Sequence, residues 1–493
     1  MSDDCHDSDS FRLPDHKPSN RTPKTLFVLS LGCPKNRVDS EWITSMLADR
    51  GLSLVSNADE ADVVLINTCA FIEPAIEESL DATLEAIALK AEDPAKKVVV
   101  AGCLPQRFGR DLADSLPEVD LLVGCSRLGD VADLITGPNR IGYRPAESRP
   151  AESRLAWSDE PSFLPQGFIH RRPSQWSHQA YVKVSEGCNR QCAFCTVPSI
   201  RGRLRSRPIS DIADEIRWLV SRGVREVTLV SQDLTAYGRD RPDRLDRQDL
   251  PDRPDLAALV EQLSSIEGLL WLRTMYLYPS AVTKRLIERL RPHCVPYLDL
   301  PIQHVSDRVL KMMGRGYGSA TVHRLMERIE DLWPEASIRA TLLVGHPGET
   351  KRDFEELKRF VAEAHIDHLG VFPFFPEEGT KSARQHPRPR RSTAQARRDE
   401  LMALAQDLSR TRLAALVGTT MEVLVDGQSG EFDHVFVGRH AGQAPDVDGV
   451  VYVTGDLRDE QGVAQLQSGD LVTIRVEQSG DYDLAGPVVA GNG

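Results

Sequence analysis

The stretch YVKVSEGCNRQCAFC, residues 181–195, joins a predicted β-strand directly to three closely spaced cysteines. Cys188, Cys192 and Cys195 have the spacing C-x3-C-x2-C, which can give three thiolates to an iron–sulfur cluster and leave a fourth iron open. A zinc site is the alternative, but it needs a fourth protein ligand, commonly from a second paired set, and none is adjacent. The spacing therefore favours an iron–sulfur cluster with one open iron.

The strand at residue 181 is the first of six that alternate with helical patterns up to about residue 375. The six runs are YVKVS, VREVTLVS, WLRTMYL, VPYLDLP, IRATLLVG and LGVFPFF. Six strand–helix units predict a partial, open (β/α)6 barrel. The three cysteines follow the first strand, at the carboxyl end where such barrels place their chemistry.

A second set of cysteines lies in the N-terminal part of the chain, which also alternates between strands and helices. The apolar runs TLFVLSLG, ADVVLINT, KKVVVAG and VDLLVG predict a small parallel α/β sheet of flavodoxin-like type. Cys33, Cys69 and Cys103 each come directly after one of these runs. Because the carboxyl ends of parallel strands meet at one edge, the three thiolates should converge there and hold a second cluster with one open iron.

Each of these cysteines taken alone could equally be a small buried hydrophobic residue. Three at the same strand-end position make coincidence a poor explanation. Cys125 also follows such a run, so it is either a spare thiol or a neighbour of the cluster, and we do not expect it to be a ligand. We expect Cys5 and Cys294 to be incidental.

Length and composition limit the class of protein. The 493 residues should form about three domains. The chain has neither a signal-peptide core nor a long apolar run, so we expect a cytoplasmic protein with no membrane partner. An odd count of nine cysteines disfavours complete disulfide pairing, and a net charge of −13 disfavours a general nucleic-acid-binding protein.

Changes in composition predict the domain boundaries. We expect a disordered tail at 1–23, an N-terminal domain at 24–138, a linker at 139–178 that includes RPAESRPAESR, and a barrel domain at 179–415. The short apolar runs MEVLVDG, HVFVGR, GVVYVTG and DLVTIRVEQ predict a small C-terminal β-barrel at 416–489.

The cysteine motif with Phe194 before its last cysteine resembles the signature of radical S-adenosylmethionine enzymes. The run SEGCNRQCAFCTVPSIRGRLRSR and the upstream three-cysteine domain are together similar to the methylthiotransferase branch of that superfamily, over nearly the whole chain from Lys24 to Pro487. The C-terminal segment resembles the TRAM domain, a module often used to hold RNA. The resemblance implies two [4Fe-4S] clusters, bound S-adenosylmethionine, and Phe194 near the adenine.

Within that branch, the chain resembles the members that modify small-subunit ribosomal protein uS12 more than those that modify transfer RNA. The similar motifs are GCPKNRVDSE at 32–41, SQDLTAYG at 231–238, LDLPIQH at 298–304, APDVDG at 444–449 and DYDLAG at 481–486. From residue 418 to 493 there are thirteen Asp and Glu against three Arg and no Lys. Such a segment would repel an RNA backbone and attract a basic protein, although acidity that only serves solubility is the alternative.

The resemblance also implies a division of labour between the two cysteine sets. The cluster on Cys188, Cys192 and Cys195 would cleave S-adenosylmethionine to a radical that takes a hydrogen from the β-carbon of an aspartate on the target protein. The cluster on Cys33, Cys69 and Cys103 would supply sulfur, and a second S-adenosylmethionine the methyl group. The partners implied are uS12, free or on the ribosome, an electron donor and a sulfide donor, and we expect a monomer.

Several other residues are candidates for supporting roles. Gln232, Gly345 and Gly348 lie where cofactor contacts are expected in this fold, although a tight turn explains the glycines equally well. The arginines at 201, 203, 205 and 207 could hold carboxylates of the cofactor or substrate, or could equally form a solvated basic loop. We expect His304 to be structural. Two other functions stay open: a transfer-RNA adenosine methylthiotransferase, and a noncatalytic iron–sulfur protein.

Overall fold

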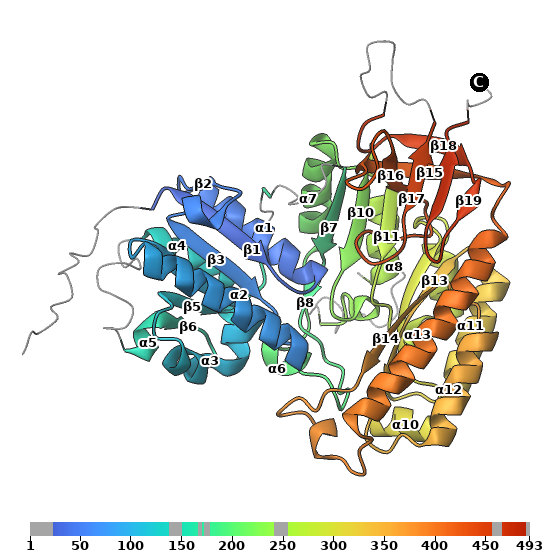
Figure 1. Ribbon diagram of the computed structural model, residues 1–493, viewed down its shortest axis with the longest axis horizontal. Helices are drawn as coiled ribbons and strands as arrows, with labels where there is room; N and C mark the ends of the chain where they lie inside the picture. Colours follow the sequence, from blue (N-terminus) through green and yellow to red (C-terminus); the bar gives the residue numbers. More distant parts are fainter. Residues whose placement is uncertain are drawn as a thin grey trace, which may run out of the picture.

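A parallel α/β sheet forms the N-terminal part of the computed structural model (Figure 1). The structure describes residues 23–137, 150–165, 170–171, 178–240, 255–455 and 466–489. The sheet has the strand order β2-β1-β3-β4-β5-β6, and every pairing in it is parallel. Its elements are β1 (Thr25–Ser30), α1 (Pro34–Ala48), β2 (Ser53–Leu54), β3 (Val63–Thr68), α2 (Glu73–Glu92), β4 (Lys97–Gly102), α3 (Cys103–Ser115), β5 (Leu121–Gly124), α4 (Val131–Thr136), α5 (Ala151–Arg154) and β6 (Leu155–Ala156).

The strands of this sheet are continuous apolar runs because both of their faces are buried. All six residues of β3 are buried, as are five of the six in β4, because helices cover both faces of the sheet. The four strands predicted from the sequence are confirmed as β1, β3, β4 and β5.

The segment predicted as a linker, 139–178, contains regular structure in the part that the structure describes. Helix α5 and strand β6 lie there, and β6 pairs in parallel with β5 at the edge of the sheet. The prolines of the RPAESRPAESR repeat disfavour regular structure, yet its last four residues form α5. The reason is Arg154, whose buried guanidinium donates to the carbonyls of Ala113, Leu116 and Val119.

Several predicted segments lie partly outside the described residues. The tail predicted for 1–23 is outside them apart from residue 23, and so is the first part of the predicted linker. The division into domains at 138, 178 and 415 stays a prediction.

The middle of the chain forms the predicted open barrel of six parallel strands. Two three-stranded sheets, β7-β10-β11 and β12-β13-β14, are joined where Val295 N donates to the carbonyl of Leu272 and Leu277 N to that of Asp299. The strands and helices are β7 (Gln179–Lys183), β8 (Ser185–Glu186), α6 (Val197–Arg201), β9 (Arg205–Ser206), α7 (Ile209–Ser221), β10 (Glu226–Val230), α8 (Leu256–Ser264), β11 (Trp271–Thr274), α9 (Lys284–Leu290), β12 (Tyr297–Gln303), α10 (Asp307–Met312), α11 (Ser319–Leu332), β13 (Ser337–Val344), α12 (Lys351–Glu363) and β14 (His368–Pro373).

The alternation of burial along β13 shows how the barrel is built. Ile338, Ala340, Leu342 and Val344 are buried and belong to the main apolar core shared with the surrounding helices. The residues between them, such as Arg339, point to the opposite, inner side of the barrel. Helix α12 begins at a capping box in which Thr350 and Asp353 exchange hydrogen bonds with each other's backbone.

Helix α13 (Arg391–Ala414) leads from the barrel to the C-terminal domain and packs along β14 and α12 (Figure 1). The C-terminal sheet has the order β18-β15-β16-β17-β20-β19, and a bridge between Ile474 and Val488 closes it into the predicted small barrel. Its strands are β15 (Thr420–Gln428), β16 (Phe436–Arg439), β17 (Val451–Thr454), β18 (Leu471–Arg475), β19 (Gln478–Ser479) and β20 (Leu484–Pro487). Within the described residues, no helix is long and apolar enough to span a membrane.

Candidate functional site: two facing sets of cysteines

The three N-terminal cysteines converge at the carboxyl edge of the first sheet. Cys33 precedes α1, Cys69 follows β3, and Cys103 begins α3 directly after β4. Asn36 ties these loops together, because its amide donates to the carbonyls of Leu31 at 3.0 Å and Thr68 at 2.9 Å. Gly32 also lies close to Cys69: a Cβ at Gly32 would come within 2.6 Å of the Cys69 Cβ.

Electrostatics show that the three thiols share one environment. Burial raises the pKa of Cys69 to about 12, and the neighbouring Cys103 and Cys33 thiols add to the rise. A hydrogen bond from the Cys125 thiol, helped by the charge of Arg201, lowers the pKa of Cys103 to about 6 despite its burial. The Cys125 sulfur lies 3.9 Å from that of Cys103. Of the two alternatives for Cys125, a spare thiol or a neighbour of the cluster, the structure therefore supports the second.

The C-x3-C-x2-C loop forms the second set, between β8 and α6. Burial raises the pKa of Cys188 to about 11 and of Cys195 to about 12, and each is raised further by the Cys192 thiol. Backbone amides already point at two of these sulfurs: Arg190 N lies 3.4 Å from the Cys188 sulfur and Val197 N 3.4 Å from that of Cys195. The Arg315 guanidinium lies 3.3 Å from the Cys192 sulfur.

The two sets face each other where the N-terminal sheet meets the barrel. The Thr196 hydroxyl, directly after Cys195, lies 3.3 Å from the carbonyl of Phe71, two residues after Cys69. Arg201, at the end of α6, places its guanidinium 3.3 Å from the Cys103 sulfur. The loops that carry the two sets are therefore in direct contact.

A buried charge network surrounds this contact. Arg201 pairs with Asp39 of α1 at 2.7 Å and with Glu186 at 3.3 Å, and it also donates to Asn36. Lys183 pairs with the same two carboxylates. Burial opposes ionisation of Glu186, but Lys183 and Arg201 outweigh it and lower its pKa to about 2. Two carboxylates and two cations thus balance each other between the cysteine sets.

Comparison with known proteins gives the three parts of the chain separate matches. Residues 182–361 match the radical SAM superfamily, residues 25–124 match the uncharacterized protein family UPF0004, and residues 417–489 match the TRAM domain. Among solved structures, the radical S-adenosylmethionine methyltransferase TsrM from Kitasatospora setae resembles this chain with a TM-score of 0.53 at 14% identity, covering 73% of this chain and 74% of TsrM. That likeness shows the fold alone.

Relatives over the full length decide the family. The chain is 42% identical to ribosomal protein uS12 methylthiotransferase RimO of Anaeromyxobacter sp. (strain Fw109-5), over 94% of this chain and 93% of that protein. The proteins of the same name from Bdellovibrio bacteriovorus and Geobacter sulfurreducens are 40% and 38% identical, covering 95% and 96% of this chain and 98% and 100% of theirs. The chain belongs to the RimO family of radical S-adenosylmethionine methylthiotransferases.

The donor set of this RimO-family chain fits the cofactors of the family, S-adenosylmethionine and two [4Fe-4S] clusters. Among the described residues, no group of three or more His, Cys, Asp or Glu is placed to hold a single metal ion. A cubane cluster has a different requirement, because each thiolate binds a separate iron and the ligands stand farther apart. Each set presents three thiols, with cationic or amide N–H groups directed at their sulfurs. This arrangement suits clusters rather than a zinc ion.

Gln232 is the predicted cofactor residue with the clearest geometry. It follows β10, and its amide nitrogen donates to Glu186 at 2.8 Å. Its side-chain oxygen is buried and has no hydrogen-bond partner in the part of the chain that the structure describes. An orphaned acceptor beside the C-x3-C-x2-C loop is what a cofactor contact requires. Phe194 lies half-buried within that loop.

The two predicted glycines are explained by the turn that they form. Gly345 has φ of 77° and Gly348 of 82°, the left-handed region that favours glycine. A Cβ would meet Ala394 at the first position and Met312 at the second. The structural reading therefore accounts for both, and a direct cofactor contact stays a prediction.

Of the remaining candidate residues, Arg201 contacts the site and the others have structural contacts. Arg203 is exposed, and its backbone carbonyl accepts a hydrogen bond from Arg205. Arg207 is buried and forms an ion pair with Glu215 at 2.6 Å. His304 is fully buried and its Nδ1 accepts from the next two backbone amides, as expected for a structural residue. Arg201 is the arginine that reaches the site. The roles of Lys183, Glu186 and Asp39 could not be found from spacing, because their partners come from different domains.

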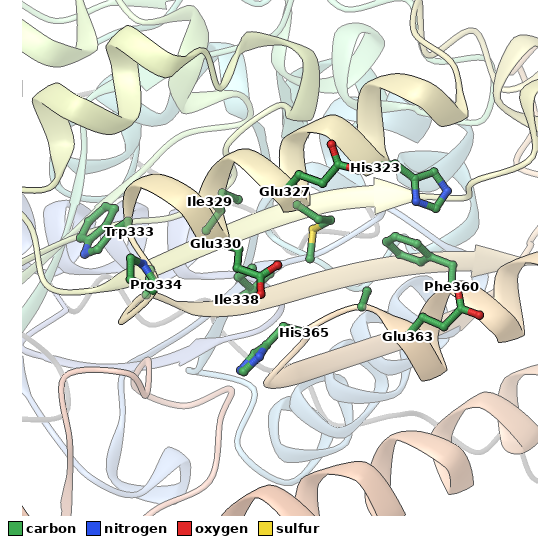
Figure 2. A pocket seen from close by; sticks show the side chains of 13 residues that line it. His323, Glu327, Ile329, Glu330, Trp333, Pro334, Ile338, Phe360, Glu363 and His365 are labelled. Carbon is green, nitrogen blue, oxygen red and sulfur yellow. The ribbon is translucent and has the colours of Figure 1, made fainter.

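A surface pocket of about 190 Å³ lies away from this site, between α11, β13 and α12 (Figure 2). It is lined by Trp333, Ile338 and Phe360 with Glu327, Glu330 and Glu363 around them. Its strand residues come from the amino end of β13, whereas both cysteine sets follow carboxyl ends. The pocket is therefore not part of the candidate site.

Proposed function

We propose that this chain transfers a methylthio group to the β-carbon of an aspartate in small-subunit ribosomal protein uS12. The observation that carries the proposal is the pair of three-thiol sets in direct contact, within a chain that aligns over nearly its full length with proteins named uS12 methylthiotransferase. A noncatalytic iron–sulfur protein has no need for a cluster with an open iron, which a set of three thiols leaves.

Each set has its own task in the proposal. Cys188, Cys192 and Cys195 would hold the cluster that binds S-adenosylmethionine, and Cys33, Cys69 and Cys103 the auxiliary cluster. When bound, these groups supply the radical, sulfur and methyl chemistry of the transfer. Phe194 and the free oxygen of Gln232 would contact the cofactor, while Gly345 and Gly348 shape the turn after β13.

The residues of the chain also exclude water from the reaction. Arg201, Lys183, Asp39 and Glu186 are all buried, and their mutual pairing seals the contact between the N-terminal sheet and the barrel. A reactive carbon radical near these side chains would be shielded from solvent. The electron and the sulfide would come from separate donors, and we propose that the protein acts as a monomer in the cytoplasm.

The test is to offer two substrates to the same enzyme. The reconstituted protein is incubated without oxygen with S-adenosylmethionine, reductant, sulfide, and either uS12 or bulk transfer RNA, and the products are analysed by mass spectrometry. The proposal expects a methylthio group on one aspartate of uS12. A methylthio group only on an adenosine of the RNA would overturn it in favour of the RNA-modifying branch.

A further inference from the structure

Lys35 is a buried cation beside the N-terminal cysteine set. It lies two residues after Cys33, in the first turn of α1, and is only 9% exposed. Its ammonium lies 3.5 Å from the centre of the Tyr276 ring, and no carboxylate forms an ion pair with it among the described residues. A buried ammonium without a carboxylate partner can pair with a carboxylate from outside the chain.

The other cations around the two cysteine sets are already used. Arg201 and Lys183 share Asp39 and Glu186, and Arg190 pairs with Asp233 at 2.6 Å. Arg315 donates to the carbonyl of Pro301 at 2.6 Å and points at Cys192. Of these five groups, Lys35 and Arg315 have no carboxylate partner in the part of the chain that the structure describes, and of these two Lys35 is the one beside the N-terminal cysteine set.

Tyr276 is held in place to receive this lysine. Its φ of 64° is a left-handed conformation that is rare for an aromatic residue. Asp299 of β12 accepts a hydrogen bond from the Tyr276 amide at 2.9 Å, and the Tyr276 carbonyl accepts one from Leu234 N at 3.1 Å. Strained backbone of this kind persists only where the surroundings fix it, and it is concentrated at functional sites.

Asp299 forms no ion pair with Lys35 within 4 Å. Its carboxylate accepts from the Tyr276 amide at 2.9 Å and pairs with Arg339, 3.9 Å away. Cys33 caps the start of α1, two residues before Lys35. The ammonium therefore sits between an N-terminal cysteine and the inner side of the barrel.

We propose that Lys35 binds the carboxylate of the aspartate that is modified, an inference that rests on the proposed function. The carboxyl carbon of aspartate is bonded directly to the β-carbon, so an anchor on the carboxylate oxygens holds the β-carbon only two bonds away. An anchor beside Cys33 would hold that carbon next to the N-terminal cysteine set, where sulfur has to reach it. The competing role for Lys35 is to balance the negative charge of the Cys33 thiolate.

The experiment measures whether Lys35 and the substrate carboxylate depend on each other. Holoenzyme with S-adenosylmethionine but no reductant is titrated with a uS12 peptide that contains the target aspartate, and with the same peptide carrying asparagine there. The wild-type chain should bind the aspartate peptide at least about tenfold more tightly. Lys35→Met should bind both peptides equally weakly, and Lys35→Arg should keep most of the preference.

Controls separate this inference from its alternatives. Lys284→Met, at an exposed lysine of α9, should keep the full preference. Equal binding of the two peptides by the wild-type chain overturns the inference. An unchanged preference for the aspartate peptide in Lys35→Met also overturns it. Loss of iron from Lys35→Met in parallel with loss of binding assigns the lysine to Cys33 instead. If the wild-type enzyme with reductant leaves the aspartate peptide unmodified, the proposed function itself fails.

Discussion

Arg201 joins the barrel to the N-terminal cysteine set. One guanidinium contacts the Cys103 sulfur, Asp39, Glu186 and Asn36, which come from three separate segments of the chain. Lysine keeps the charge but lacks the planar fork needed to reach all of them. Arg201→Lys should therefore lose the auxiliary cluster and keep the other, so that iron and sulfide analysis finds one cluster per chain in place of two.

Arg203→Lys is the matched control, because Arg203 is exposed and should keep both clusters. Electron paramagnetic resonance of the reduced protein distinguishes which cluster remains. Equal loss of both clusters from Arg201→Lys would show that the arginine supports the fold in general and has no specific link to the N-terminal set.

His304 makes stability depend on pH in a predictable direction. Burial lowers its pKa to about 3, so it stays neutral in the folded chain, whereas it binds a proton near pH 6.5 when unfolded. The unfolded state then binds more protons, and stability is lost as pH falls from about 6.5 towards 3. His304→Asn keeps an acceptor near the Nδ1 position and removes the titration.

Chemical denaturation at pH 7.5 and pH 5 measures this effect. The wild-type chain should lose more stability between the two values than His304→Asn does. An identical loss in the two proteins would mean that His304 is protonated in the folded chain or accessible to solvent.

At the scale of elements, α5 and β6 depend on one buried side chain. Arg154 donates to three carbonyls around the end of α3, at 2.6 to 3.0 Å. Removing a charged donor from buried carbonyls costs about 1–3 kcal/mol. Arg154→Met should release β6 from the sheet edge, seen as faster hydrogen exchange across residues 151–156 with little change in β3 and β4.

Arg110→Met is the comparison for this prediction. Arg110 pairs with Glu152 of α5, but both side chains are about two-thirds exposed, at 65% and 64%. An exposed pair contributes less than about 1 kcal/mol, so exchange in β6 should barely change. If both variants release β6 equally, the buried contacts of Arg154 are not what holds it.

These elements also show which features a sequence can predict. The long apolar runs of β3, β4 and β13 and the cysteines after them were predictable, because burial on both faces and strand-end position leave a local pattern. Strand β6 was not, since only two residues pair and the helix before it is held by an arginine whose partners lie more than thirty positions away. The Arg201 network was missed for the same reason: each of its residues is ordinary in its own segment.

For the whole molecule, the loop between β16 and β17 fixes the C-terminal domain to the barrel. Asp448 accepts from the Tyr297 hydroxyl at 2.7 Å and pairs with Arg339 at 2.5 Å, and Asp446 pairs with Arg37 of α1 at 2.7 Å. The APDVDG motif thus joins all three parts of the chain. Part of the acidity counted in this domain is used internally, so the charge that it offers to a partner is smaller than its composition indicates.

Asp448→Asn tests this attachment. Breaking a buried ion pair leaves the charge of Arg339 poorly compensated and should destabilise the protein by about 3 kcal/mol. Thermal unfolding should show an earlier transition, with faster hydrogen exchange in β16 and β17. Asp433→Asn, at an exposed acidic residue of the same domain, should leave both unchanged. A Tm in Asp448→Asn equal to that of the control would contradict this role.

The most direct test of the whole account separates the tasks of the two cysteine sets in one assay. Cys69→Ala and Cys192→Ala proteins are incubated without oxygen with S-adenosylmethionine, reductant, sulfide and uS12, and both deoxyadenosine and modified uS12 are quantified by mass spectrometry. The account predicts that Cys192→Ala forms neither product, whereas Cys69→Ala releases deoxyadenosine and leaves uS12 without a methylthio group. Methylthio-uS12 from Cys69→Ala, or deoxyadenosine from Cys192→Ala at the wild-type level, would contradict it.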